Sequence, residues 1–81
     1  MAQTSATGRM IAGNLRRMMK TRGLTQQQLA DLCEWSQPRV HDLLSARHDP
    51  RISTLEHVAN ALGIAVNELL APAPDLAEPR L

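Results

Sequence analysis

The side chains with the widest chemical scope lie close together in the middle of the chain. Gln37, Arg39, His41 and Asp42 bring an amide, a guanidinium, an imidazole and a carboxylate into one short stretch. Such groups donate and accept several hydrogen bonds, and Gln and Arg can form them in pairs. The sequence shows no nucleophile, base and orienting group together and no Gly-rich phosphate loop. It therefore predicts non-covalent recognition of a polar partner rather than an enzyme.

The other reactive residue types do not indicate a metal or redox centre. His41, His48, His57 and Cys33 lack a close ligand spacing such as C-x₂-C or H-x₃-H. Because Cys33 is the only cysteine, it cannot form an internal disulfide, and its apolar surroundings predict a small buried hydrophobic residue. Trp35 is expected to lie partly buried over a corner between two helices. We expect no metal and no cofactor.

Two short helices must position the polar groups. Thr25 and Gln28 form a capping box that starts the first helix, and the break follows at residues 34–35. Ser36 is the expected cap of the second helix, with Gln37 as the alternative, because the residue before a proline avoids helical backbone angles. Two helices with a tight break form a helix-turn-helix pattern, and its second helix carries the polar row.

Three further helices are expected in an all-α chain. The first spans about residues 8–23, the fourth begins at a second capping box formed by Ser53 and Glu56 and ends at Gly63, and a short fifth follows. Gly13 indicates either a close helix crossing or a tolerated site. Helical periodicity predicts the following inward-facing residues: Ile11, Leu15, Met18, Met19, Leu29, Leu32, Cys33, Val40, Leu43, Leu44, Leu55, Val58, Ala59, Leu62, Ile64, Val66, Leu69 and Leu70.

Length and composition fit one compact domain. The chain has 81 residues, one Trp and neither Phe nor Tyr, so its core must be built from aliphatic side chains and Met. We expect residues 8–71 to form the domain, residues 1–7 to be a disordered N-terminal arm, and residues 72–81 to be a flexible Pro-rich tail. No signal peptide or membrane-spanning run is visible, which predicts a soluble, cytoplasmic protein.

Charge is distributed unevenly along the chain. Residues 1–51 hold eight Lys and Arg and four acids, which gives +4, whereas residues 52–81 hold one Arg and four acids, which gives −3. The two values sum to the net charge of +1. This division predicts that the basic part of the chain contacts a polyanion and that the acidic part does not. The alternative is an uneven surface charge without a function.

The sequence resembles the lambda-repressor/Cro (XRE) family of helix-turn-helix DNA-binding domains. The resemblance runs from about Leu15 to Leu70 and rests on residues 23–30 (GLTQQQLA), 35–40 (WSQPRV) and 55–64 (LEHVANALGI), in family order and at family spacing. It implies a compact five-helix fold whose third helix enters the DNA major groove. Family members usually bind two-fold related half-sites as dimers, often as transcriptional repressors.

The resemblance also implies roles for individual side chains. Gln37 matches a base-reading Gln of the family, and Gln26 matches a phosphate-binding Gln. Arg39 can pair with guanine or reach a phosphate, and Asp42 can accept from cytosine. The expected base-reading set is Gln37, Pro38, Arg39, His41 and Asp42, and the expected phosphate-binding set is Gln26, Ser36, Ser45, Arg47, Arg51 and Arg16. Solvated surface is the alternative for His41 and Asp42, and for some of the basic residues of the first helix.

Three features depart from the family pattern. Glu34 and Ala46 occupy positions where the family commonly has glycine, so Glu34 must either adopt a left-handed conformation at a cost of about 1 kcal/mol or bend differently. The positions of a frequent Arg and Glu pair hold Met19 and Leu44. Because packed hydrophobic residues often replace a buried ion pair without loss of stability, we predict that these two side chains are in contact.

The expected function is that of a sequence-specific, double-stranded DNA-binding transcriptional regulator that acts as a dimeric repressor on a palindromic operator. Ile64, Val66, Leu69 and Leu70 are the expected dimer interface, although the same residues could cap the core. One alternative is the antitoxin of a toxin–antitoxin pair, with a toxin as partner. The other is a protein-interaction module that has lost DNA binding. No membrane partner and no small-molecule substrate are expected.

Overall fold

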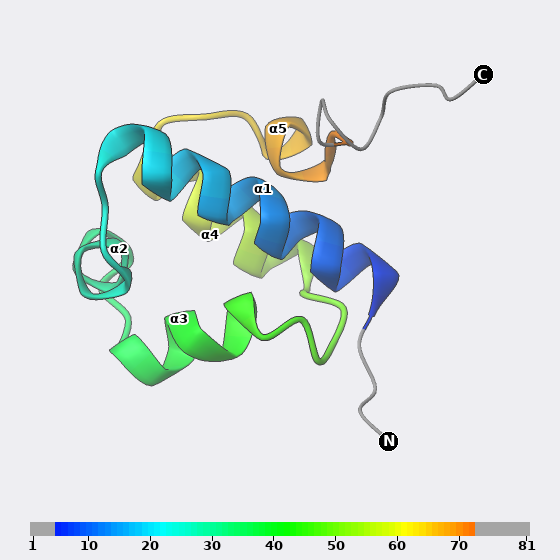
Figure 1. The fold of residues 1–81 in the computed structure, drawn as a ribbon, viewed down its shortest axis with the longest axis horizontal. Coiled ribbons are helices and arrows are strands. Elements are labelled where there is room, and N and C mark those ends of the chain that lie inside the picture. Colours follow the sequence, from blue (N-terminus) through cyan, green and yellow to red (C-terminus); the bar gives the residue numbers. More distant parts are fainter. Residues whose placement is uncertain (1–4, 73–81) are drawn as a thin grey trace.

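The fold consists of five helices around one aliphatic core. The computed structural model describes residues 5–72, which contain α1 (Ala6–Arg22), α2 (Gln26–Cys33), α3 (Gln37–Leu44), α4 (Ile52–Leu62) and α5 (Val66–Leu70), and no strand occurs among them. The longest helix, α1, crosses the molecule and packs against α3 on one side and α5 on the other (Figure 1). In addition, α2 packs against α3 and α4, and α4 packs against α5. The predicted all-α, five-helix architecture is confirmed.

Most predicted core residues are buried, with one clear exception. Periodicity places Leu32 on the inward face, but half of its surface is exposed (50%), and Ala30 is buried in its place. The prediction for Leu32 is therefore wrong, because α2 turns its Leu29, Ala30 and Cys33 face toward α3 and α4. Leu43 is only half-buried but packs against the core.

The pair Met19 and Leu44 lies in this core. Both side chains are buried, on two helices that pack against each other. Direct contact between the two side chains stays a prediction.

The helix ends at the turn follow the sequence signals. The capping box of Thr25 and Gln28 is present, and the Ser36 hydroxyl accepts a hydrogen bond from the Arg39 amide, so Ser36 is the cap rather than Gln37. Glu34 adopts the left-handed conformation, with φ of 59°, which is one of its two expected alternatives. Ala46 has a similar φ of 61°. Both residues use a conformation that glycine adopts at lower cost.

Two other helices begin at different residues than the sequence predicts. The first residue of α1 is Ala6, and Ser5 caps it by accepting from the Gly8 amide, so residues 5–7 do not belong to a disordered arm. For α4, Arg51 is the N-terminal cap and makes no side-chain capping bond. Ser53 lies inside the first turn of α4, so the capping box predicted for it does not form. Residues 1–4 of the expected arm and residues 73–81 of the expected tail lie outside the described residues.

Main-chain groups on α3 and the loop after it anchor α3 to α1. The Arg16 guanidinium donates to the Leu44 carbonyl at 3.3 Å, and the Ser5 amide donates to the Ala46 carbonyl at 2.9 Å. A Cβ atom at Gly8 would lie 2.8 Å from the carbonyl oxygen of His48, so this site has no room for a larger residue. A Cβ atom at Gly13 would meet no atom of the described residues within 4 Å, which identifies a tolerated site and excludes a close helix crossing there.

Asn14 joins α1 to the end of α5 and is the buried polar residue of the described core. Its side chain is 1% exposed, and its Nδ2 donates to the carbonyls of Leu69 and Ala71, each at 2.6 Å. Its Oδ1 accepts from the Arg17 guanidinium. All hydrogen-bonding groups of the Asn14 amide therefore face polar partners, as burial requires.

Candidate nucleic-acid interface

The polar row of α3 lies on the surface of the molecule. Gln37, Pro38, Arg39, His41 and Asp42 are all exposed, whereas Val40 and Leu44 on the opposite face are buried. The Ser36 cap starts the helix, and Pro38 in its first turn costs no helical hydrogen bond. The five side chains predicted to read DNA bases thus lie on one capped helix, whose opposite face is fixed in the hydrophobic core.

A first hollow borders α3 on the side of α2. It has a volume of about 350 Å³ and is lined by Gln26, Gln37, Pro38 and His41. Gln26 is the first residue of α2 and Gln37 the first residue of α3, so the structure brings the amino ends of both helices together. The side chains here are amides and an imidazole, which can donate to and accept from a neutral partner or donate to an anion.

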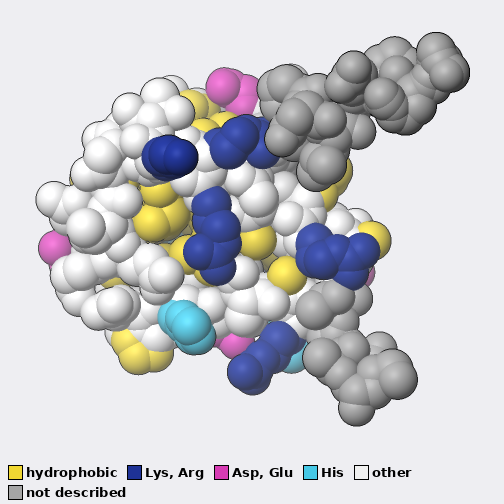
Figure 2. Space-filling view, viewed as in Figure 1, with side chains coloured by type: hydrophobic (Ala, Val, Ile, Leu, Met, Phe, Trp, Pro, Cys, Tyr) yellow, Lys and Arg dark blue, Asp and Glu magenta, His cyan; other side chains and the backbone are white. Residues whose placement is uncertain are grey.

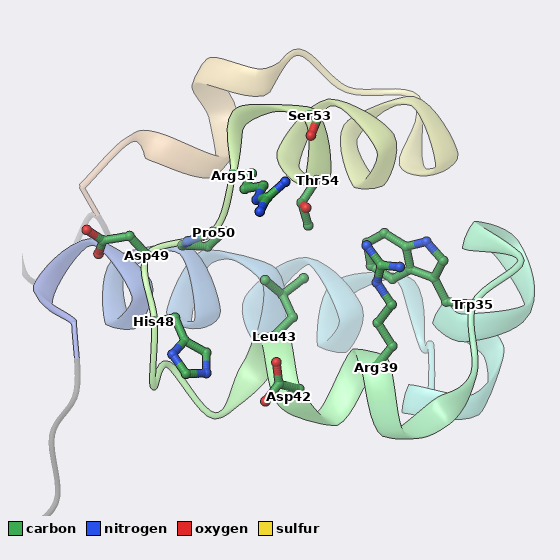
Figure 3. A pocket seen from close by; sticks show the side chains of 10 residues that line it. All are labelled: Trp35, Arg39, Asp42, Leu43, His48, Asp49, Pro50, Arg51, Ser53 and Thr54. Atoms are coloured by element: carbon green, nitrogen blue, oxygen red, sulfur yellow. The ribbon is translucent and has the colours of Figure 1, made fainter.

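A second hollow borders α3 on the side of α4 (Figure 3). It has a volume of about 390 Å³, and Arg39 and Asp42 of α3 line it together with Arg51 at the start of α4. The remaining lining residues are Trp35, Leu43, His48, Asp49, Pro50, Ser53 and Thr54. The predicted base-reading residues therefore divide between two sides of the helix, since Gln37 and His41 line the first hollow and Arg39 and Asp42 line the second.

Trp35 is the centre of a stack at the second hollow. The Cζ atom of Arg39 lies 4.3 Å from the Trp35 ring centroid, a cation–π distance. The His57 ring stacks on Trp35 with a centroid separation of 4.9 Å and an interplanar angle of 10°. Nε2 of His57 lies 2.6 Å from the Cys33 carbonyl oxygen, and because a carbonyl only accepts, this nitrogen carries the hydrogen. The prediction of a partly buried Trp35 at the helix corner is confirmed.

The sequence does not indicate that His57 belongs to this site. It belongs to α4, and its position over Trp35 depends on how α4 packs against α2. No local pattern around His57 carries that information. The signal available in the sequence is Trp35 itself, a large ring at a turn that requires a neighbour to cover it.

Cys33 is buried next to this stack, since its main-chain carbonyl accepts from His57. Its side chain is 1% exposed, and burial raises the pKa of the thiol, while the charge of Arg39 acts in the opposite direction. A raised pKa keeps the thiol protonated and unreactive near neutral pH. The prediction of a small buried hydrophobic residue is confirmed.

The residues predicted to bind phosphate flank α3, but several also have roles within the fold. Ser36 caps α3, the Ser45 hydroxyl donates to the Asp42 carbonyl at 2.6 Å, and Arg16 donates to the Leu44 carbonyl. Arg47 and Arg51 are exposed in the loop after α3. On the face that carries α1, Lys and Arg side chains outnumber Asp and Glu side chains (Figure 2). The basic first half of the sequence therefore supplies one basic face of the molecule.

The residues predicted to form the dimer interface do not share one environment. Leu69 is 0% exposed, so it belongs to the core of the protomer and its predicted place in a dimer interface is wrong. Its burial follows from the packing of α5 against α1 and α4. Ile64, Val66 and Leu70 are half-buried and pack against the core. The alternative role, in which these residues cap the core, holds for Leu69.

Comparison with protein families identifies the domain. A family described as a helix-turn-helix domain matches residues 11–71. The chain belongs to the lambda-repressor-like helix-turn-helix family. The matched range runs from α1 to the end of α5, and within it α2, the turn at Glu34 and Trp35, and α3 form the helix-turn-helix motif of this family.

Individual relatives support this assignment. The domain is 38% identical over 60 residues to the immunity repressor protein of Bacillus phage phi105, and the match covers 74% of this chain and 42% of that protein. It is 30% identical over 67 residues to the uncharacterized HTH-type transcriptional regulator y4dJ of Sinorhizobium fredii, covering 83% of this chain and 87% of that protein. The helix-turn-helix domain thus spans less than half of the phage repressor and most of the second relative.

A solved structure shares the fold. The crystal structure of the hypothetical transcription factor NHTF from Neisseria matches with a TM-score of 0.77 and 29% sequence identity, covering 85% of this chain and 79% of that chain. No helix of this helix-turn-helix domain, within residues 5–72, is long and apolar enough to cross a membrane.

Proposed function

We propose that this chain is a sequence-specific transcriptional regulator that binds double-stranded DNA through α3 and acts as a dimeric repressor on a palindromic operator. The observation that carries the proposal is the arrangement around α3. Five exposed side chains lie on one capped helix, with Gln26 on one side and Arg51 on the other. A helix of about 10–12 Å diameter fits the major groove, where its exposed face meets base edges and its flanks meet the two strands.

The side chains divide between the two tasks of a DNA-binding helix. The amide of Gln37, the first residue of α3, can form a bidentate pair with adenine, and His41 and Asp42 lie further along the same helix. Gln26 and Arg51, on opposite sides, suit the phosphates of the two strands. Ser36 uses its oxygen to cap α3, so its hydroxyl hydrogen is available to a phosphate.

The names of relatives support a regulatory role. One relative is named an immunity repressor and another an HTH-type transcriptional regulator. The domain spans 42% of the phage repressor, so repression by this chain is part of the proposal.

A dimer is proposed because one such domain reads only about 4–6 base pairs, which gives little specificity. Two copies with half-sites about 34 Å apart would double the site. The half-buried residues Ile64, Val66 and Leu70 at α5 are the proposed contact, without Leu69.

Selection of bound DNA from a random duplex pool tests the proposal most directly. Enrichment of a palindrome is the expected result, and sedimentation of the complex should give two chains per site. Absence of binding to duplex DNA at about 50 mM salt would contradict DNA binding and favour a protein-interaction module.

Two variants then separate base reading from phosphate binding. Gln37→Ala should relax the preference at one base pair, with a loss of about 1–3 kcal/mol on the selected site. Arg51→Ala should weaken binding to all sequences alike and reduce the salt slope by about one. Gln27→Ala is a matched control because Gln27 is bonded to Asp31 on α2. Equal losses for Gln37→Ala and Arg51→Ala on every sequence would show that these roles are wrongly assigned.

A further inference from the structure

The side chain of Arg39 is supported in a way that sets it apart from the rest of the exposed row. Its guanidinium carbon lies 4.3 Å from the centre of the Trp35 ring, and that ring lies against His57 on α4. Figure 3 shows Arg39 and Trp35 together at one end of the second hollow, with Arg51 and Thr54 across it. The guanidinium is therefore held at the α4 edge of α3.

We propose that Trp35 is a positioning residue for DNA binding, which holds the Arg39 guanidinium at the α4 edge of α3 so that Arg39 binds a backbone phosphate rather than a base. This inference rests on the proposed function. The sequence allows Arg39 either to pair with guanine or to bind a phosphate, and the inference selects the phosphate. Trp35, which lies in the turn before α3, then contributes to DNA binding.

The ring restricts where Arg39 can donate its hydrogen bonds. The N–H groups of a guanidinium lie in one plane, so a cation that rests on an aromatic face keeps its donors available at its edge. An unsupported Arg side chain has many rotamers and loses that freedom when it binds. Contact with Trp35 restricts the rotamers before any DNA arrives, and such preorganisation strengthens binding.

The surroundings of the guanidinium favour a phosphate. Arg39 shares its hollow with Arg51 and with Ser53 and Thr54 in the first turn of α4, whereas Gln37 lines the other hollow. Asp42 and Asp49 also line the second hollow, and their carboxylates would repel a phosphate close to them. The place best suited to a phosphate is therefore between Arg39 and Arg51.

The Trp35 ring has a second contact besides Arg39. The His57 ring stacks on Trp35 with a centroid separation of 4.9 Å, and its Nε2–H donates to the Cys33 carbonyl at 2.6 Å. The ring is thus anchored by α4 and by the end of α2. Removing the Arg39 side chain should leave Trp35 in place, which allows the two residues to be varied separately.

A double-mutant cycle tests the coupling. Binding of the wild type, Trp35→Leu, Arg39→Ala and the double variant would be measured on a mixed-sequence duplex at about 50 mM salt and on the sequence enriched by selection. We expect Trp35→Leu to weaken binding roughly two- to fivefold when Arg39 is present and to have no further effect when it is absent. Trp35→Phe should keep most of the affinity because it keeps an aromatic face.

The salt dependence tests the role of Arg39 itself. Arg39→Ala should weaken binding to both duplexes by the same factor and reduce the salt slope by about one. Relaxed preference at a single base pair would overturn the phosphate role. An equal effect of Trp35→Leu with and without Arg39 would overturn the positioning role.

An NMR measurement on the DNA-free wild type tests the contact of Arg39 with Trp35 even if a Trp35 variant does not fold. The ring current of Trp35 should shift the δ protons of Arg39 upfield in the wild-type NMR spectrum, and Trp35→Phe should reduce this shift. Unshifted δ protons in the wild type would overturn the inference even if Trp35→Leu does not fold. If the wild type binds no duplex, the proposed function fails and this inference with it, whereas binding without coupling refutes this inference alone.

Discussion

Replacing Asn14 with Ala should destabilise the domain more than most single substitutions. The change removes two hydrogen bonds from Nδ2 to the carbonyls of Leu69 and Ala71, at 2.6 Å each, and the contact of Oδ1 with Arg17. Each neutral hydrogen bond contributes about 1 kcal/mol, and a carbonyl left buried without a partner costs more. We expect a loss of about 2–3 kcal/mol, which lowers the Tm of a domain of this size by roughly 10–20 °C.

The assay is thermal and urea unfolding followed by circular dichroism. Asn60→Ala is the matched control, because Asn60 is exposed on α4 and its loss should change the free energy of unfolding by less than about 0.5 kcal/mol. If Asn14→Ala were as stable as this control, the hydrogen bonds to α5 would contribute nothing and the argument would be refuted.

The variant Asn14→Asp distinguishes the contribution of the Asn14 Nδ2 donor from that of its Oδ1 acceptor. It keeps an acceptor for Arg17 but, when ionised, turns an oxygen toward the carbonyls of Leu69 and Ala71. Burial and these two carbonyls should raise the pKa of the new carboxyl in the folded state. A raised pKa means that stability is present at low pH and lost as the pH rises, so the deficit relative to wild type should shrink from about pH 7 to about pH 4. A constant deficit would show that Arg17 compensates for the charge.

Three further predictions concern the glycines of α1, the turn at Glu34 and the buried thiol of Cys33. Gly13→Ala should raise the free energy of unfolding by about 0.5–1 kcal/mol, whereas Gly8→Ala should lower it, because a Cβ at Gly8 meets the His48 carbonyl at 2.8 Å. Equal effects of the two substitutions in urea unfolding would contradict the packing of α1 on the loop that contains His48. Glu34→Gly should stabilise by about 1 kcal/mol, since φ is 59° there, and an unchanged Tm would show that the left-handed residue carries no strain. Burial raises the pKa of the Cys33 thiol, so this thiol should react slowly with iodoacetamide near neutral pH. The free energy of unfolding should fall as the pH rises above about 9, where the thiol of the unfolded chain ionises, and Cys33→Ser should abolish this fall.

The helix-turn-helix motif could be predicted because its signals are local. The capping box at Thr25, the cap at Ser36 and the proline in the first turn of α3 each act over three or four residues. Such signals do not depend on the rest of the fold. They place α2 and α3 correctly and put the exposed polar row on the right face.

The errors lie where packing between distant elements decides the outcome. In α2, the spacing of Leu29, Leu32 and Cys33 suits a helix face as well as the spacing of Leu29, Ala30 and Cys33, and only contact with α3 and α4 selects the second face. The burial of Leu69 likewise depends on α1. Periodicity identifies a face of a helix but does not determine how deeply it is covered.

Asn14 and His57 illustrate two kinds of omission. Asn14 falls on the same helix face as Ile11 and Met18, so a polar residue in that apolar stripe is a usable signal of a buried hydrogen bond. The contact of His57 with Trp35 joins residues that are far apart in the sequence, and no local rule predicts it. The candidate site could therefore be outlined from the sequence, but its support from α4 could not.

The anchoring of α3 by main-chain carbonyls has a consequence for evolution and engineering. Arg16 and Ser5 hold α3 and its following loop through the carbonyls of Leu44 and Ala46, which every residue type supplies. Substitutions at Gln37, His41 and Asp42 therefore leave these attachments intact. A duplicated gene could acquire a new target by changing a few codons without losing a stable product, and a library randomised at these three positions should retain folded members at high frequency.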